Sequence, residues 1–186
     1  MKHINEIYES VLDDQFEENS AIKIIEEWIE HNVICSKVKI NPKTLEINAE
    51  DFLIVKNDEP IPDFIKLNKI ENFSASFIDI DHIVVPLPKT CVKIGIYADD
   101  CVKLELKNNT TTDTMTLDCD ASEIVFSGQI KSTVLDISSC KWADKIVGLS
   151  KVHTREINLP TILCENILKK VLGFTSNITR IQDNPL

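Results

Sequence analysis

The chain has 186 residues, of which 43% are apolar, and a formal net charge of −10 at pH 7. No segment approaches the ~20 consecutive apolar residues of a membrane-spanning helix, and the acidic N-terminus lacks the apolar core of a secretory signal. These features exclude a helical membrane protein and predict a cytoplasmic or virion-packaged protein with one main domain and an appendage.

An acidic segment opens the chain. Residues 1–32 carry nine acidic side chains and only two lysines, so most of the net charge lies there. Ile4, Ile7 and Val11 recur at helical spacing and predict a first amphipathic helix with one apolar stripe. The acidic side chains are then expected to form a solvated helix face.

A second helix is expected directly afterwards. It begins near Ser20, whose side chain suits an N-cap, and it ends around Asn32. Trp28 lies on its apolar stripe and is interpreted as a core anchor. Residues 1–33 are therefore predicted to form an acidic two-helix cap, which packs on the open end of a repeat-containing β domain over residues 34–186.

From Cys35 onward the apolar period changes from helical to two. Apolar residues separated by one position predict short strands, each with one buried face. These pairs are Val38/Ile40, Leu45/Ile47, Phe52/Ile54, Ile65/Leu67, Ile78/Ile80, Ile94/Ile96, Leu104/Leu106, Met115/Leu117, Ile124/Phe126, Leu135/Ile137 and Ile157/Leu159.

The later strand pairs repeat at a nearly fixed interval. Ile94, Met115, Leu135 and Ile157 follow one another at steps of 20 to 22 residues, with another apolar segment midway. Such a period predicts a stacked solenoid. The alternative is an antiparallel β-sandwich, but the chain contains no Asn-Gly or Asp-Gly, which tight hairpins favour. We therefore expect a mainly-β solenoid with helices.

One repeat resembles a known family. Residues 135–140 read Leu-Asp-Ile-Ser-Ser-Cys and match the LxLxxN/C core of leucine-rich repeats, and Ile146 and Leu149 resemble the leucines that precede the next strand. Earlier repeats depart from the pattern, because Asp99 and Asp120 stand where Asn or Cys is expected. The chain thus resembles irregular leucine-rich-repeat-like proteins of bacteria and tailed phages, which implies a scaffold that binds another protein.

The first ten residues carry a second resemblance. They read Met-Lys-His-Ile-Asn-Glu-Ile-Tyr-Glu-Ser and are similar to the N-terminal targeting segments of internal head proteins of tailed phages. In that family the segment targets cargo to the prohead, and a protease cuts after Leu/Ile-x-Glu, which Ile4-Asn5-Glu6 and Ile7-Tyr8-Glu9 both fit. The resemblance therefore implies targeting roles for Ile4, Glu6, Ile7 and Glu9. An alternative function for the protein is therefore that of a virion structural or packaged internal head protein. The alternative role of the segment itself is that of a helix that only caps the solenoid.

Exposed residues on the repeat strands are the expected contact surface for a protein partner. They lie between buried positions and therefore point to solvent. The candidate partner-binding residues are Lys93, Gly95, Thr116, Asp118, Asp136, Ser138 and Asn158, with Trp142 as an aromatic anchor beside them.

Catalytic and nucleic-acid-binding patterns are missing from the sequence. It contains no GxSxG, Walker, GxGxxG or HExxH motif, and no basic stripe suited to DNA or RNA. Its six cysteines include no CxxC and are expected to be reduced thiols without a metal. We therefore predict no enzyme activity, no cofactor and no metal.

The remaining alternative is a divergent hydrolase or ligand-binding protein on a sandwich fold. It would need a deep pocket lined by Asp79, Asp81 or His82. Strand alternation instead predicts that Asp79 and Asp81 share a solvated strand face, opposite Ile78 and Ile80.

Overall fold

The computed structural model describes residues 20–55, 61–62 and 64–160, and the backbone of 178–184. A helix over residues 20–32 precedes two sheets, whose strands pair mainly in parallel. Sheet A contains β1 (Val33–Cys35), β2 (Val38–Asn41), β3 (Glu46–Ile54), β4 (Lys66–Ile78), β6 (Thr90–Asp99), β8 (Thr110–Cys119), β10 (Ile130–Asp136), β12 (Val152–Pro160) and β13 (Ile178–Asn184). Sheet B contains β5 (His82–Pro86), β7 (Lys103–Lys107), β9 (Glu123–Phe126) and β11 (Lys145–Val147).

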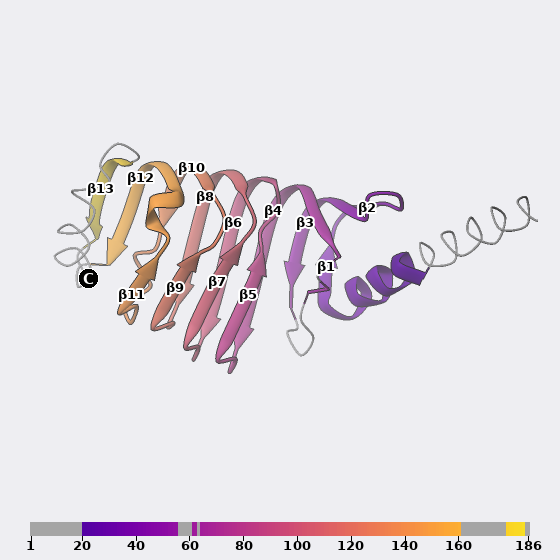
Figure 1. The fold of residues 1–186 in the computed structure, drawn as a ribbon, viewed down its shortest axis with the longest axis horizontal. Helices are drawn as coiled ribbons and strands as arrows, with labels where there is room; N and C mark the ends of the chain where they lie inside the picture. The colour runs from indigo at the N-terminus through magenta and orange to yellow at the C-terminus, as the bar shows by residue number, and fades with distance from the viewer. Residues whose placement is uncertain (1–19, 56–60, 63, 161–177, 185–186) are drawn as a thin grey trace, which may run out of the picture.

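The strands wind into a β-solenoid of about five turns (Figure 1). The strands of sheet A from β3 to β13 pair in parallel, as do those of sheet B. From β4 to β12 the chain alternates between the two sheets. β1 and β2 pair antiparallel with β3 at the N-terminal end. The expected mainly-β solenoid is confirmed, and the parallel pairing removes the antiparallel sandwich.

The predicted interval is the length of one coil. Phe73, Ile94, Met115, Leu135 and Ile157 stack in register across successive strands of sheet A, and all are buried. The midway apolar segments form the facing row in sheet B, where the paired residues are Ile83, Leu104, Ile124 and Ile146. The core is therefore a column of aliphatic and aromatic layers between the two sheets.

Both sides of the described coils are built from strands between β4 and β12. On the side opposite sheet A, the described coils carry the strands of sheet B. A 3-10 turn, η1 (Leu149–Lys151), follows β11. The reason is local: Leu104/Leu106 and Ile124/Phe126 alternate with a period of two, which buries one face of a strand.

The predicted strand over Ile78 and Ile80 is wrong. β4 ends at Ile78, whose side chain is 68% exposed, and Asp79 takes a left-handed backbone with φ of 57°. Asp tolerates this conformation, and the Asp79 N–H donates to the Asp99 carbonyl of the next coil. Asp79 therefore stands at a corner of the coil, and it does not share a strand face with Asp81.

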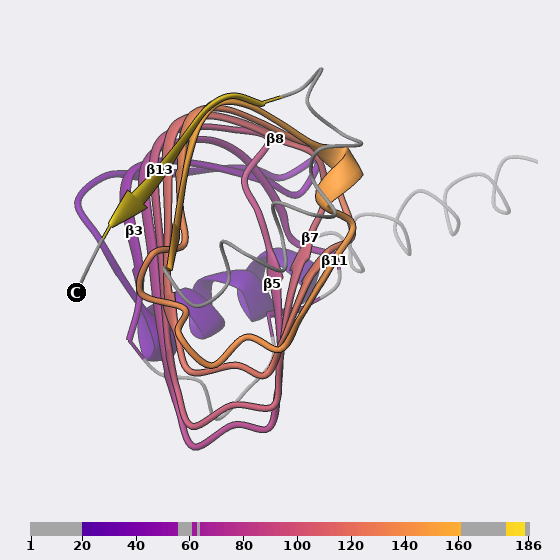
Figure 2. The same ribbon diagram turned by 90° about the vertical axis from the view of Figure 1, so that its left-hand side faces the viewer.

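The helix over residues 20–32 packs against the first coil, as expected for the second cap helix. Ile25 and Trp28 are buried, and the Trp28 ring stacks on Phe52 with centroids 6.5 Å apart. Phe52 in turn stacks on Phe73 at 6.1 Å. Figure 2 shows this helix lying across the end of the coils.

The first predicted helix lies outside the described residues. No helix in the described part combines the length and hydrophobicity needed to span a membrane.

Candidate functional site

Four of the predicted partner-binding residues form one row on the outer side of sheet A. Gly95 pairs with Thr116, Thr116 with Asp136, and Asp136 with Asn158, across β6, β8, β10 and β12. Adjacent strands in a sheet are ~4.8 Å apart, so the row is straight and regularly spaced. Gly95, Thr116 and Asp136 are half-buried by their neighbours and keep part of their surface in solvent.

Asn158 departs from its predicted exposure. It is only 9% exposed, and the two residues that follow it on β12, Leu159 and Pro160, are buried as well. Its Oδ1 atom is buried without a hydrogen-bond partner among the described residues. The accessible part of the row therefore runs from Gly95 to Asp136.

Tyr97 adds an aromatic side chain that the sequence prediction missed. An added Cβ at Gly95 would lie 3.2 Å from the Cε2 and hydroxyl atoms of Tyr97, so this ring lies against the glycine. Tyr97 is 45% exposed and pairs in register with the exposed Asp118, and Lys93 is exposed two residues before Gly95. The signal was present, because Tyr97 follows the buried Ile96 and strand alternation turns it outward.

Ser138 and Trp142 lie beyond the end of β10. The Asp136 carboxylate accepts hydrogen bonds from the Ser138 N–H at 3.0 Å and from its hydroxyl at 2.7 Å, which fixes the start of the connection. Trp142 lies farther along the same connection and is 69% exposed. The structure thus places Trp142 at a corner of the coil, whereas the row lies on the strands.

Four cysteine side chains are buried in the interior of the same coils. The Sγ atoms of Cys119 and Cys140 are 3.2 Å apart in neighbouring coils. This hydrogen bond lowers the pKa of Cys119 and raises that of Cys140. Burial raises the pKa of Cys91 and of Cys101 to about 11. Cys91 and Cys101 are therefore protonated at neutral pH and pack as small apolar groups.

The carboxylates considered for catalysis do not converge. Asp79, Asp81 and His82 are all exposed around the corner between β4 and β5. The described residues include no group of three or more His, Cys, Asp or Glu arranged to hold a metal ion. These residues therefore do not line the deep pocket that the hydrolase alternative required.

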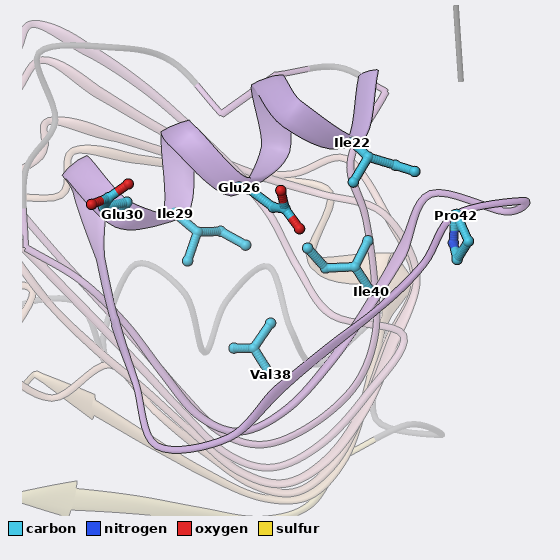
Figure 3. Close-up of a pocket in the computed structure, with 7 residues that line it drawn as sticks. All are labelled: Ile22, Glu26, Ile29, Glu30, Val38, Ile40 and Pro42. Atoms are coloured by element: carbon cyan, nitrogen blue, oxygen red, sulfur yellow. The ribbon is translucent and has the colours of Figure 1, made fainter. Parts of the chain in front are cut away.

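A groove lies between the cap helix and β2 (Figure 3). Its volume is about 510 Å³. Ile22 and Ile29 line it from the helix, and Val38 and Ile40 face them from β2, while Glu26 and Glu30 bring carboxylates to the helix side. The lining residues are Ile22, Glu26, Ile29, Glu30, Val38, Ile40 and Pro42.

The four candidate targeting residues, Ile4, Glu6, Ile7 and Glu9, lie outside the described residues.

No relative is found. Comparisons with protein-family models, with curated proteins and with solved structures give no match to this chain.

Proposed function

We propose that this protein is a non-catalytic scaffold that binds another protein through the outer side of sheet A. The observation that carries the proposal is the in-register row of Gly95, Thr116 and Asp136, with the Tyr97 ring beside it. Each strand of the row is hydrogen-bonded on both sides within a continuous sheet. Such a surface is already ordered, so a partner that binds it loses little conformational entropy from the scaffold.

Tyr97 is the proposed anchor of this contact. Tyrosine presents a large contact area with few rotatable bonds, and interface hot spots are enriched in it. Asp118 lies beside Tyr97 in the β-sheet register, and Lys93 lies on the other side of Gly95 along β6. Opposite charges on the two sides of an aromatic anchor fix the orientation of a partner and select its charge pattern.

Affinity purification with matched variants tests the proposal. The full-length protein is used as bait, retained proteins are purified, and the dissociation constant of each is measured by titration. Tyr97→Ala and Asp136→Lys are expected to weaken the specific complex by at least about tenfold. Val84→Lys is the control, because Val84 is 52% exposed on β5 of sheet B. Equal affinities for all variants, or the absence of any saturable partner, would contradict the proposal.

A further inference from the structure

Exposed lysines gather at one edge of the solenoid, where each coil passes from sheet B back to sheet A. Lys89 lies in the connection between β5 and β6, and Lys107 ends β7 just before the next connection. Lys131 and Lys151 occupy the corresponding region of the following coils. We call this set the basic edge; its members are Lys66, Lys69, Lys89, Lys107, Lys131 and Lys151, all of them exposed.

The β-sheet register aligns part of the basic edge along the solenoid axis. Lys69 pairs with Thr90, Thr90 with Thr111, and Thr111 with Lys131. The Thr111 N–H donates to the carbonyl oxygen of Lys89, which places Lys89 next to this row. Coils repeat every ~4.8 Å, so the lysines form a stripe parallel to the axis.

The opposite edge, where sheet A passes to sheet B, is acidic. Its carboxylates include Asp79, Asp99 and Asp120, which stand at successive corners of the coil. The full set is Asp79, Asp81, Asp99, Asp100, Asp118, Asp120, Glu123 and Asp144. A nearly neutral body is thus polarised across its width, and an anion is attracted to one edge and repelled from the other.

The basic edge keeps its charge available. The ion pairs of the described residues involve Lys23, Lys37, Lys103 and Lys145, none of which belongs to the basic edge. Lys151 donates to the Ser127 carbonyl at 2.9 Å. Nearby carboxylates are few among the described residues. Glu46 pairs with Lys66 in the β-sheet register. Glu71 and Asp113 line a shallow hollow together with Lys69.

A polar hollow of about 220 Å³ lies within the basic edge. Lys89 and Lys131 contribute to its lining together with the exposed side chains of Asn109, Thr111 and Gln129. The Asn109 side-chain oxygen accepts the Gln129 N–H at 2.8 Å, which leaves its amide group free to donate. Two ammonium groups surrounded by amides and hydroxyls suit a ligand that carries both negative charge and hydroxyl groups.

We propose that the basic edge binds a linear anionic polysaccharide, with Lys89 and Lys131 contacting its carboxylate or sulfate groups. A sugar polymer presents charge and hydroxyls in a repeat, as the stacked coils present lysine, amide and hydroxyl groups. Nucleic acid fits less well. Of the exposed Phe, Tyr and Trp residues of the described chain, Tyr97 and Trp142 lie elsewhere, and Phe64 lies two residues before Lys66. None of them lines the hollow, so bases have no stacking platform there. The members of the basic edge are also lysines, which lack the planar guanidinium group with which arginine binds two phosphate oxygens at once.

Binding assays on the full-length protein test this proposal with defined probes. Immobilised polygalacturonate and heparin carry carboxylates and sulfates, and dextran is the neutral control. Binding to one or both charged polysaccharides is expected at low salt, with affinity that falls as salt rises, and dextran should not bind. The preferred probe distinguishes a carboxylate ligand from a sulfate ligand.

Charge variants locate the site. Lys89→Glu/Lys131→Glu is expected to lower affinity by at least about tenfold, and Lys89→Gln/Lys131→Gln to lower it less. Lys141→Glu/Lys145→Glu is the matched control, because it changes the net charge equally at two exposed positions on the opposite edge. Thermal unfolding of each variant verifies that it is folded.

Three results would overturn the proposal: no binding to either charged polysaccharide, an equal loss in the control variant, or tighter binding to duplex DNA or polyglutamate. This inference concerns a different surface from the proposed protein contact. Tyr97→Ala should leave polysaccharide binding unchanged, so failure of one proposal is distinguishable from failure of the other.

Discussion

The Oγ1 atom of Thr112 lies 3.1 Å from the carbonyl oxygen of Val92 in the preceding coil and 3.1 Å from that of Thr114 in its own strand. Thr154 repeats this arrangement with the Thr133 carbonyl at 3.2 Å. A buried hydroxyl therefore links neighbouring coils within sheet A.

Two threonines of β8 are predicted to respond oppositely to the same substitution. Thr112→Val should lower the free energy of unfolding by about 1–2 kcal/mol, because it removes the one hydroxyl proton that the Val92 and Thr114 carbonyl oxygens can accept. Thr110→Val should be neutral or stabilising, because the buried Oγ1 of Thr110 has no partner among the described residues. Urea denaturation measures both effects. An equal loss in both variants would contradict the role of the Thr112 hydroxyl.

Gly128→Ala is predicted to be strongly destabilising. An added Cβ would lie 1.8 Å from the Asn108 carbonyl oxygen, and this backbone belongs to the adjacent corner of the coil. We expect a loss of about 3 kcal/mol, because stacked corners have no space to move apart. Gly95→Ala is the matched control, since its 3.2 Å contact involves the movable Tyr97 ring and should cost less. Thermal denaturation that ranks the two variants in reverse would rule out this explanation.

Phe73→Ala is expected to lower the free energy of unfolding by about 3–5 kcal/mol. Phe73 is 1% exposed and continues the ring stack from Trp28 through Phe52 into the solenoid core. Ile78→Ala on the same strand should change stability by less than about 0.5 kcal/mol, because Ile78 is 68% exposed. Similar losses in the two variants would mean that the ring stack does not anchor the cap.

Alkaline pH is predicted to destabilise the fold through its buried thiols. Burial raises the pKa of Cys91 from 9.0 to about 11, so the folded state holds this proton more strongly than the unfolded chain does. The resulting stability is fully present below pH 9 and is lost as pH rises towards 11. Denaturation between these pH values should show a steeper loss for the native protein than for Cys91→Ala. Parallel pH profiles would exclude Cys91 as a contributor.

The sequence by itself determined the coil. Ile94, Met115 and Leu135 recur at the coil length and each lies between two less buried neighbours, and both properties are local enough to read along the chain. The corner at Asp79 was missed because its conformation depends on a hydrogen bond to the next coil. The burial of Asn158 was missed because alternation along the strand predicts an exposed side chain there, whereas contacts from elsewhere in the fold decide its burial.

Only the tertiary structure decided where the charges gather. The sequence showed no basic stripe because Lys69, Lys89 and Lys131 are about one or more coils apart along the chain. Parallel pairing places the strands of successive coils ~4.8 Å apart. Lysines that are far apart along the chain therefore lie on the same edge. The same pairing places the carboxylates of the connections from sheet A to sheet B on the opposite edge. Local periodicity therefore determines the strands, and the stacking of coils determines which surface each charge joins.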